Sequence, residues 1–169
     1  IREQQIREVF MNQTNNTYDN CKIENNITNN IVIFGNEDFS YIEKDALLEA
    51  LHTKNTISKL CQLMRNNPNY PENRNIKVTD VSRKKVKVYT EDGWIPANPV
   101  ETFNNMIMES SDILDSKTDS GSGEYEYYYN KIDGITDKVH DMDMAKDNGD
   151  DTNWAKENRN EIMLQFVDT

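Results

Sequence analysis

The sequence predicts an α+β fold that consists of an N-terminal stem, a small mixed domain and an acidic helical tail. Three observations support this organisation. Apolar residues recur at helical spacing in several segments, their period shortens to two between positions 76 and 89, and acidic residues concentrate toward the C-terminal end. Hydrophobic residues make up 36% of the chain and the mean hydropathy is −0.89, so we expect a modest core together with extended or self-associating segments.

Charge divides the chain into two parts. Residues 1–100 carry 13 acidic and 13 basic side chains, a balance of 0, whereas residues 101–169 carry 17 acidic and 6 basic, a balance of −11. An acidic surface repels phosphate backbones, so we expect no direct nucleic-acid binding by this region. The acidic part is either a solvated surface or a docking surface for a basic protein partner.

Residues 1–30 are predicted to be an oligomerisation stem. Their apolar residues follow a heptad register that polar residues interrupt in the middle, and polar seam residues weaken a coiled coil while fixing its register. We expect a helix up to about Gln13, then extended chains that pair between two or three copies. With one residue of the next segment added, the predicted oligomer interface is Ile6, Val9, Ile23, Ile27 and Ile31.

Residues 31–115 are predicted to form the small α+β domain, which begins with a strand and a helix. The β-branched run of residues 31–34 predicts a short strand that ends in a turn at Gly35. Ser40 and Glu43 have the spacing of a capping box, in which each side chain satisfies the free amide of the other residue. This pattern predicts the start of the first helix.

A second helix is predicted to start at Thr56 and to end near Asn66. Its end follows from Pro68 and Pro71, which cannot donate to a helical ladder. Cys61 falls on the apolar stripe of this helix and is predicted to be a buried thiol.

A three-stranded antiparallel meander follows. Apolar and polar residues alternate over residues 76–79 and again over residues 85–89, and Asp92-Gly93 supplies a tight turn before Trp94. We expect one face of this sheet to be buried and Trp94 to cover the core.

Asn98 and Pro99 mark the start of the next helix, as N-cap and first helical residue. The residues expected on the inner face of this helix are Val100, Phe103, Ile107 and Leu114.

Residues 116–123 read as a flexible Gly/Ser linker, and residues 124–169 as an acidic, Tyr-rich helical tail. Apolar residues at a spacing of three and four predict either a short coiled coil or a helix docked on the body, and the expected seam is Ile132, Ile135, Val139 and Met142. A last helix is predicted from about Trp154, after a break at residues 147–151. The apolar residues expected inside it are Ile162, Met163, Phe166 and Val167.

Aromatic residues of the tail are the candidates for partner binding, because tyrosine combines a large contact area with a polar tip. The alternative is that they pack the tail onto its own body. The candidates are Tyr125, Tyr127, Tyr128, Tyr129 and Trp154.

The sequence contains no recognisable catalytic constellation. It lacks a phosphate-binding Gly-rich loop and a Gly-x-Ser-x-Gly elbow, and its two cysteines and two histidines match no zinc motif. Cys61 with His52, and His140 with its neighbouring aspartates, are more simply explained as structural or solvated residues. No apolar run is long enough to span a membrane. We therefore expect no enzyme activity, no cofactor, no metal and no membrane partner.

One basic cluster stands out against the acidic background. Arg83, Lys84 and Lys85 lie next to Lys87 and Tyr89, and basic residues beside aromatic ones can bind nucleic acid. A turn and the solvated face of a sheet have the same composition, which is the simpler reading. The cluster could also meet the acidic tail, within one chain or between subunits.

The stretch from Asn25 to Leu114 resembles a region of nucleocytoplasmic large DNA virus (giant virus) proteins. There it follows a coiled coil, which a zinc finger or a KilA-N-like or MSV199-like DNA-binding domain often precedes. The likeness rests on three patterns, in residues 31–42 (Ile-Val-Ile-Phe-Gly, then Glu-Asp-Phe-Ser-Tyr-Ile), residues 67–78 (Asn-Pro-Asn-Tyr-Pro-Glu-Asn-Arg-Asn-Ile-Lys-Val) and residues 86–94 (Val-Lys-Val-Tyr, then Asp-Gly-Trp). Related sequences often have histidine where Asn69 and Arg74 stand here. The resemblance implies an accessory module and not a catalyst.

These observations together predict a non-enzymatic oligomerisation and protein-interaction module of a giant-virus protein. One alternative is a virion structural protein, either capsid-associated or internal. Another is the regulatory part of a viral DNA-binding protein whose head lies upstream, since the chain begins at Ile1 and is expected to be part of a longer protein. The expected location is the host cytoplasm or viral factory, or the virion itself.

Overall fold

The computed structural model describes residues 30–118 and 123–168 of the chain. The predicted stem residues Ile6, Val9, Ile23 and Ile27 lie outside the described residues. Ile31 lies within them, half-buried and not in a strand. From Val32 onward the chain forms one compact unit.

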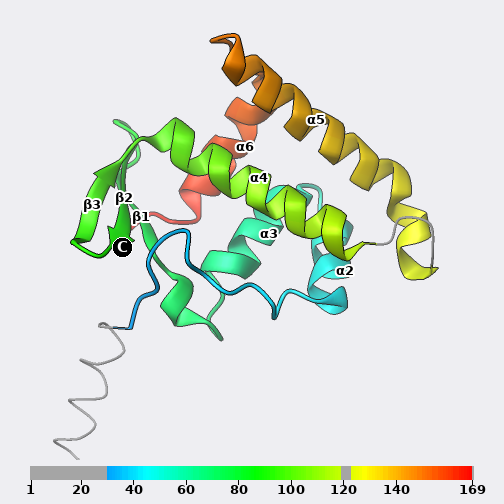
Figure 1. Ribbon diagram of the computed structural model, residues 1–169, viewed down its shortest axis with the longest axis horizontal. Coiled ribbons are helices and arrows are strands. Elements are labelled where there is room, and N and C mark those ends of the chain that lie inside the picture. Colours follow the sequence, from blue (N-terminus) through cyan, green and yellow to red (C-terminus); the bar gives the residue numbers. More distant parts are fainter. Residues whose placement is uncertain (1–29, 119–122, 169) are drawn as a thin grey trace, which may run out of the picture. The chain divides into compact units, whose positions relative to one another are not determined.

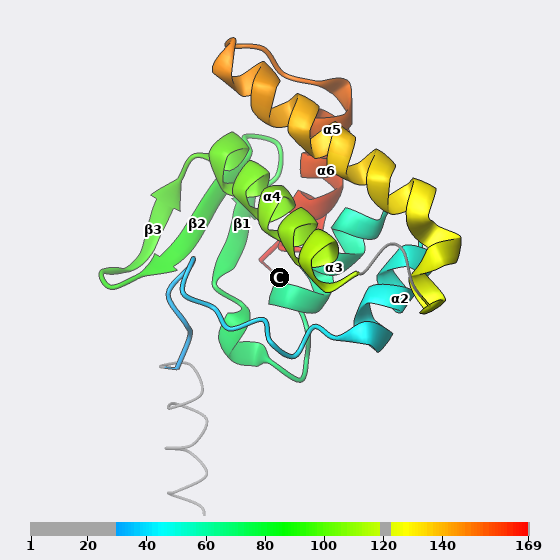
Figure 2. The same ribbon diagram turned by 45° about the vertical axis from the view of Figure 1, so that its right-hand side comes forward.

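The described domain is mixed helix and sheet, which confirms the predicted α+β class (Figure 1). In chain order its elements are α2 (Lys44–His52), α3 (Thr56–Arg65), the 3-10 turn η1 (Pro71–Asn73), β1 (Ile76–Asp80), β2 (Lys85–Thr90), β3 (Gly93–Ala97), α4 (Pro99–Lys117), the 3-10 turn η2 (Gly123–Tyr128), α5 (Tyr129–Asp147) and α6 (Asn153–Leu164). The sheet lies at one end of α4, and α4 passes across α3 toward α2 (Figures 1 and 2).

The sheet is the predicted antiparallel meander in the order β1-β2-β3. Ile76 pairs with Val88 and Val78 with Val86, and all four side chains are buried on the face that meets the helices. After α6 the chain returns to the edge of β1, where Val167 forms a single parallel bridge with Val78. This return places the end of the described chain beside the first strand.

Local capping explains two of the helix starts. Asn55 accepts a hydrogen bond from the amide of Ser58 at 3.0 Å, and Asn98 accepts one from the amide of Glu101 at 3.1 Å. These bonds satisfy amides that have no partner inside the helix. The predicted start of α4 at Asn98 is thereby confirmed, as is the predicted start of α3 at Thr56.

Two predictions for the segment before α2 are wrong. Ser40 and Glu43 form no capping box, because the amide of Ser40 donates to Asp38 Oδ1 at 2.9 Å and α2 starts only at Lys44. Residues 31–34 form no strand. The segment is instead attached to other parts of the chain by separate backbone bonds, from Val32 N to Glu72 O and from Phe34 N to Tyr89 O, each 2.9 Å long.

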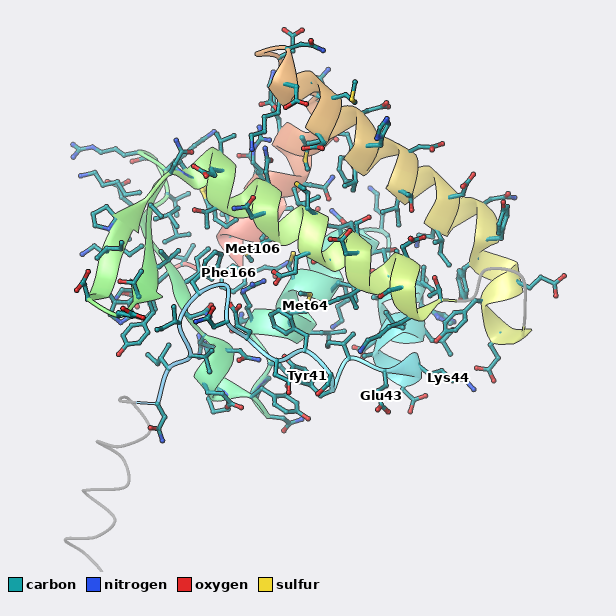
Figure 3. The ribbon with its side chains drawn as sticks, viewed as in Figure 1. Tyr41, Glu43, Lys44, Met64, Met106 and Phe166 are labelled. Carbon is teal, nitrogen blue, oxygen red and sulfur yellow. The ribbon has the colours of Figure 1, made fainter. Side chains whose placement is uncertain are left out.

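The tail is part of the core rather than an appendage. Ile162 and Phe166 pack in the same cluster as Val78 and Met106, and Ile132 joins a second cluster around α2 and α3. Figure 3 shows Met106 on α4 close to Phe166. The predicted boundary at residues 116–123 therefore does not separate two cores. Residues 119–122 lie outside the described residues.

Three residues that we expected in the core lie outside it. Val100 is 48% exposed and Val167 is 37% exposed, although both lie next to buried positions. Trp94 pairs with Tyr89 on the face of the sheet opposite the buried valines, where the ammonium of Lys77 lies 4.4 Å from its ring centre. Trp94 is thus a surface residue held by a cation–π contact, and it does not cover the core.

Candidate functional site

The four tyrosines of the tail divide into two pairs. Tyr125 and Tyr128 pack against the cluster around α2, whereas Tyr127 is 87% exposed and Tyr129 is 47% exposed. One pair therefore packs the tail onto the body, and the other pair leaves aromatic surface exposed to solvent. Exposed aromatic surface of this kind is a common feature of interaction sites.

The turn η2 is attached to α2 by polar contacts. The hydroxyl of Tyr128 lies 3.0 Å from His52 Nδ1, and Lys44 forms an ion pair with Glu124 at 2.8 Å. His52 thus pairs with a tyrosine and not with Cys61. These contacts hold the exposed Tyr127 at a defined place.

Helix α5 has three distinct sides. Ile132, Ile135, Val139 and Met142 pack into the domain, as predicted for a docked helix. On the solvent side, residues spaced by four or six positions form what we call the acidic face, consisting of Tyr129, Asp133, Asp137, Asp143 and Asp147. All five are exposed. The exposed Tyr127 lies in η2, two residues before the first residue of the acidic face.

The third side of α5 borders a hollow of about 690 Å³, which we call the α5–α6 hollow. It is lined by the residues that start α3, by one side of α5 and by one side of α6. Gly134 contributes no side chain to this wall, and a methyl group added there would meet nothing within 4 Å. Trp154, which the sequence singled out, also lies here and not on the acidic face.

Three lysines line the hollow: Lys54, Lys131 and Lys138. Lys131 donates to Leu51 O at 2.7 Å and to Thr53 O at 2.6 Å, so it caps the last carbonyl groups of α2. Burial lowers the pKa of Lys131. Lys54 and Lys138 are exposed, which leaves their charges accessible from the hollow.

The wall of the hollow contains buried oxygens without a hydrogen-bond partner. Thr56 is 2% exposed and Asn158 is 4% exposed, and both residues line the hollow. Neither Thr56 Oγ1 nor Asn158 Oδ1 has a partner within the described residues. An unsatisfied buried polar atom costs about 1–3 kcal/mol, so such atoms call for an explanation.

The patterns that carry the family resemblance meet around one buried arginine. Arg65 donates from Nε to Glu37 Oε1 at 2.9 Å, and Asn75 donates to the same carboxylate oxygen at 2.5 Å. Asn73 donates to the hydroxyl of Tyr41 at 3.2 Å. These residues hold the segment before α2 against α3 and β1. Their role is structural, whereas Asn69 and Arg74 are exposed.

The basic cluster lies on the open side of the sheet and at the β1–β2 turn. Arg83, Lys84 and Lys85 are exposed at this turn, and Arg83 pairs with Asp80 at 3.8 Å. Lys77, which is not part of the cluster, forms an ion pair of 3.8 Å with Asp168 of the tail.

Cys61 is a free, fully buried thiol, as predicted. Its sulfur lies 3.3 Å from Ser110 Oγ, and burial raises the pKa of the thiol to about 11. Among residues 30–118 and 123–168, no three histidine, cysteine or acidic side chains are grouped so that they could hold a metal ion. No helix in this part of the chain is both long and apolar enough to cross a membrane.

No family model matches the chain, and no curated protein or solved structure is significantly similar to it. The resemblance to giant-virus proteins stays a prediction.

Proposed function

We propose that the chain is a non-enzymatic oligomerisation and protein-interaction module. In this proposal the acidic face, together with Tyr127, binds a basic segment of a partner protein. The observation that carries the proposal is the exposure of two tyrosines, 87% for Tyr127 and 47% for Tyr129, beside a row of aspartates. Tyrosines supply contact area, and the aspartates supply charge that attracts lysine and arginine.

The composition of the tail supports a basic partner. Residues 123–168 carry 12 acidic and 5 basic side chains, a balance of −7. Such a field accelerates association with a cationic segment and weakens as salt is added. Met144, which is 50% exposed on the same side of α5, adds apolar area at the far end of the acidic face.

Oligomerisation through residues 1–30 would present two or three copies of this surface. Linked copies bind a repeated partner more tightly than one copy does, without any new contact. In the giant-virus setting that the resemblance implies, the module would gather a basic viral protein in the viral factory or in the particle.

A binding experiment on the full chain tests the surface. Fluorescence anisotropy would compare a lysine- and arginine-rich peptide with a peptide in which glutamine replaces those residues. We expect only the basic peptide to bind, and its affinity to fall as salt rises. The paired substitution Tyr127→Ala with Tyr129→Ala should weaken binding about tenfold or more.

The matched control is Leu164→Ala, because Leu164 is another large exposed apolar residue, 61% exposed, but lies on α6. It should leave peptide affinity unchanged. Equal binding of both peptides, or full affinity in the tyrosine variant, would contradict the proposed surface. Sedimentation equilibrium of the same full chain tests the stem: a dimer or trimer is expected, and a monomer at all concentrations would remove the oligomerisation part of the proposal.

A further inference from the structure

We propose that a groove beside the start of α4 receives the side chain of Tyr127 from a second copy of the chain. The groove lies between the β1–β2 turn, the first turn of α4 and one side of α6, and has a volume of about 260 Å³. We call it the α4–α6 groove. This inference rests on the proposed function, because it names the surface that the exposed tyrosine of the tail meets.

The α4–α6 groove has an apolar lining. Pro99, Val100, Phe103 and Met163 contribute to it. Phe103 and Met163 belong to the core, whereas Val100 is 48% exposed, so apolar surface stays open to solvent here. Pockets that hold whole small molecules have volumes of about 300–1,000 Å³. At about 260 Å³, the groove is better matched to one large side chain.

The free charges around the groove are positive. Among its lining residues, all of them in the described part of the chain, Asp151 is the one acidic residue, and the guanidinium of Arg159 binds its carboxylate. Arg159 also donates to Asn104 Oδ1 at 2.8 Å, so it holds α6 against α4. Lys84 and Lys156 are exposed and form no ion pair with another described residue. Their charges therefore favour an occupant with acidic neighbours.

The backbone of Lys84 supports a role for its charge. Its φ is +51°, in the left-handed region that glycine adopts without steric cost and that other residues rarely adopt. A turn selected for stability alone would have glycine at this position. Residues that keep such a conformation cluster at functional sites.

Tyr127 has the properties that the groove requires. It is 87% exposed, more than any other large hydrophobic residue in the described part of the chain. Its ring meets that of Tyr128 edge-on, with centroids 5.0 Å apart, and Tyr128 packs onto the cluster around α2. The neighbouring Glu126 is exposed and forms no ion pair with another described residue. An aromatic ring beside a free carboxylate thus matches an apolar groove beside free cations, and its fixed position lowers the entropy lost on binding.

The groove and Tyr127 cannot meet within one chain. The groove borders the first turn of α4, whereas η2 follows the end of that helix. The 19 residues of α4 span about 27 Å. Figure 1 shows the sheet and η2 at opposite ends of α4. The tyrosine must therefore come from another copy.

The contact joins two different surfaces, so it repeats head to tail and builds a ring or a chain of copies. A single tyrosine in a groove buries little area and binds weakly. Oligomerisation through residues 1–30, as in the proposed function, would supply the high local concentration that such a contact needs.

Photo-cross-linking of the full chain tests the contact. The photoreactive amino acid p-benzoylphenylalanine at position 127 keeps an aromatic ring there and bonds to groups that it touches. A mixture of unlabelled and isotope-labelled copies, analysed by mass spectrometry, distinguishes bonds between copies from bonds within one copy. We expect cross-links between copies to residues 99–103 and 156–163. Absence of these cross-links would overturn the inference. If the basic peptide still bound the acidic face, the proposed function would stand without it.

Substitutions that preserve the fold locate the contact. Val100→Glu places a carboxylate in the groove, where it repels Glu126, and an acidic residue in the first turn of a helix is favourable. It should lower the yield of these cross-links about tenfold, as expected for the loss of an anchor site. The matched control Leu164→Glu adds the same charge to an exposed residue of α6 outside the groove and should leave the yield unchanged. An unchanged yield in a folded Val100→Glu protein would overturn the inference.

Lys84→Gly separates the charge of the turn from its stability. Glycine adopts the local backbone readily, so the variant should unfold at the same or a higher urea concentration than the parent protein. It should nevertheless give fewer cross-links, because one cation at the groove is gone. A full yield in this variant would show that Lys84 takes no part.

A charge exchange between two copies identifies the partners directly. Glu126→Lys in the cross-linking copy, or Lys84→Glu with Lys156→Glu in the receiving copy, should each lower the yield. The two altered copies mixed together should restore it, because opposite charges face each other again. If the mixture gave no more product than either change alone, the two surfaces would not be in contact.

Discussion

Arg65 donates from Nε to Glu37 Oε1 at 2.9 Å, and both side chains are completely shielded from solvent. Nη2 of the same guanidinium reaches Glu109 Oε2 at 2.6 Å, while the rings of Phe34 and Phe39 each lie 4.9 Å from Cζ. Burial alone lowers the pKa of Arg65, but the charges of Glu37 and Glu109 outweigh it and raise the pKa further above its usual value. The arginine therefore stays charged in the core.

Removal of Glu37 should destabilise the domain strongly. Glu37→Ala leaves the buried cation of Arg65 with Glu109 alone, and breaking a buried pair in this way costs about 3–5 kcal/mol. Urea unfolding followed by circular dichroism measures the change. The matched control is Glu124→Ala, which breaks the exposed pair with Lys44, 57% and 58% exposed, and should leave the midpoint of unfolding in place. Equal effects of the two substitutions would show that burial of the Arg65 pair does not matter.

Asn75, which lies in the sequence pattern of residues 67–78, should be required for the stability of the fold rather than for binding. Asn75→Ala removes the bonds to Val32 O and Glu37 Oε1, of which only Glu37 Oε1 keeps another donor, Arg65, so we expect a loss of about 1–3 kcal/mol in the free energy of unfolding. Asn69→Ala changes an exposed residue of the same motif and serves as the control. If Asn75→Ala unfolded at the wild-type urea concentration, the structural reading of the motif would have to be given up.

The packing of the tail against the sheet should be required for the stability of the domain. Phe166 is 6% exposed and packs against the sheet, so Phe166→Ala should cost about 3–5 kcal/mol through lost contacts and the cavity that remains. Leu164→Ala, two residues earlier and 61% exposed, should have little effect. Thermal unfolding of both variants makes the comparison. If the tail did not contribute to the core, both variants would unfold at the same temperature as the parent protein.

Local signals in the sequence predicted most elements of the fold. The N-caps at Asn55 and Asn98 act within one turn, and alternation along β1 and β2 specifies the buried face of the sheet, so both could be identified from neighbouring residues alone. The segment before α2 could not, because its conformation depends on Arg65, which is far away in sequence. The β-branched run at residues 31–34 is attached by single backbone bonds to Glu72 and Tyr89 rather than by strand pairing.

The candidate sites were only partly predictable. The tyrosines were recognisable by type, but which of them stay exposed depends on how η2 packs against α2. The α5–α6 hollow joins residues around positions 55, 134 and 157, and no local pattern connects them. Trp154 could be identified as an aromatic candidate from the sequence. The buried, unpartnered oxygens of Thr56 and Asn158, which line the same hollow, could be identified only from the structure.

The buried thiol of Cys61 should make stability depend on pH in the alkaline range. In the unfolded chain a thiol has its ordinary pKa of 9.0, whereas burial raises the pKa of Cys61 in the folded protein to about 11. As pH rises, the unfolded state therefore loses the proton first, and unfolding becomes more favourable between these two values. Below pH 9.0 the contribution of the neutral thiol is almost fully present, and by pH 11 its loss amounts to about 2 kcal/mol.

Urea unfolding at a series of pH values from below 9.0 upward would measure this effect. Tyrosines and lysines titrate in the same range, so the quantity of interest is the difference between the parent protein and Cys61→Ala, both carrying Cys21→Ser to remove the second thiol. We expect this difference to be constant at neutral pH and to shrink as the thiol of the unfolded parent ionises, because alanine has no proton to lose. A difference that stayed constant up to pH 11 would mean that Cys61 is not held as a neutral thiol in the core.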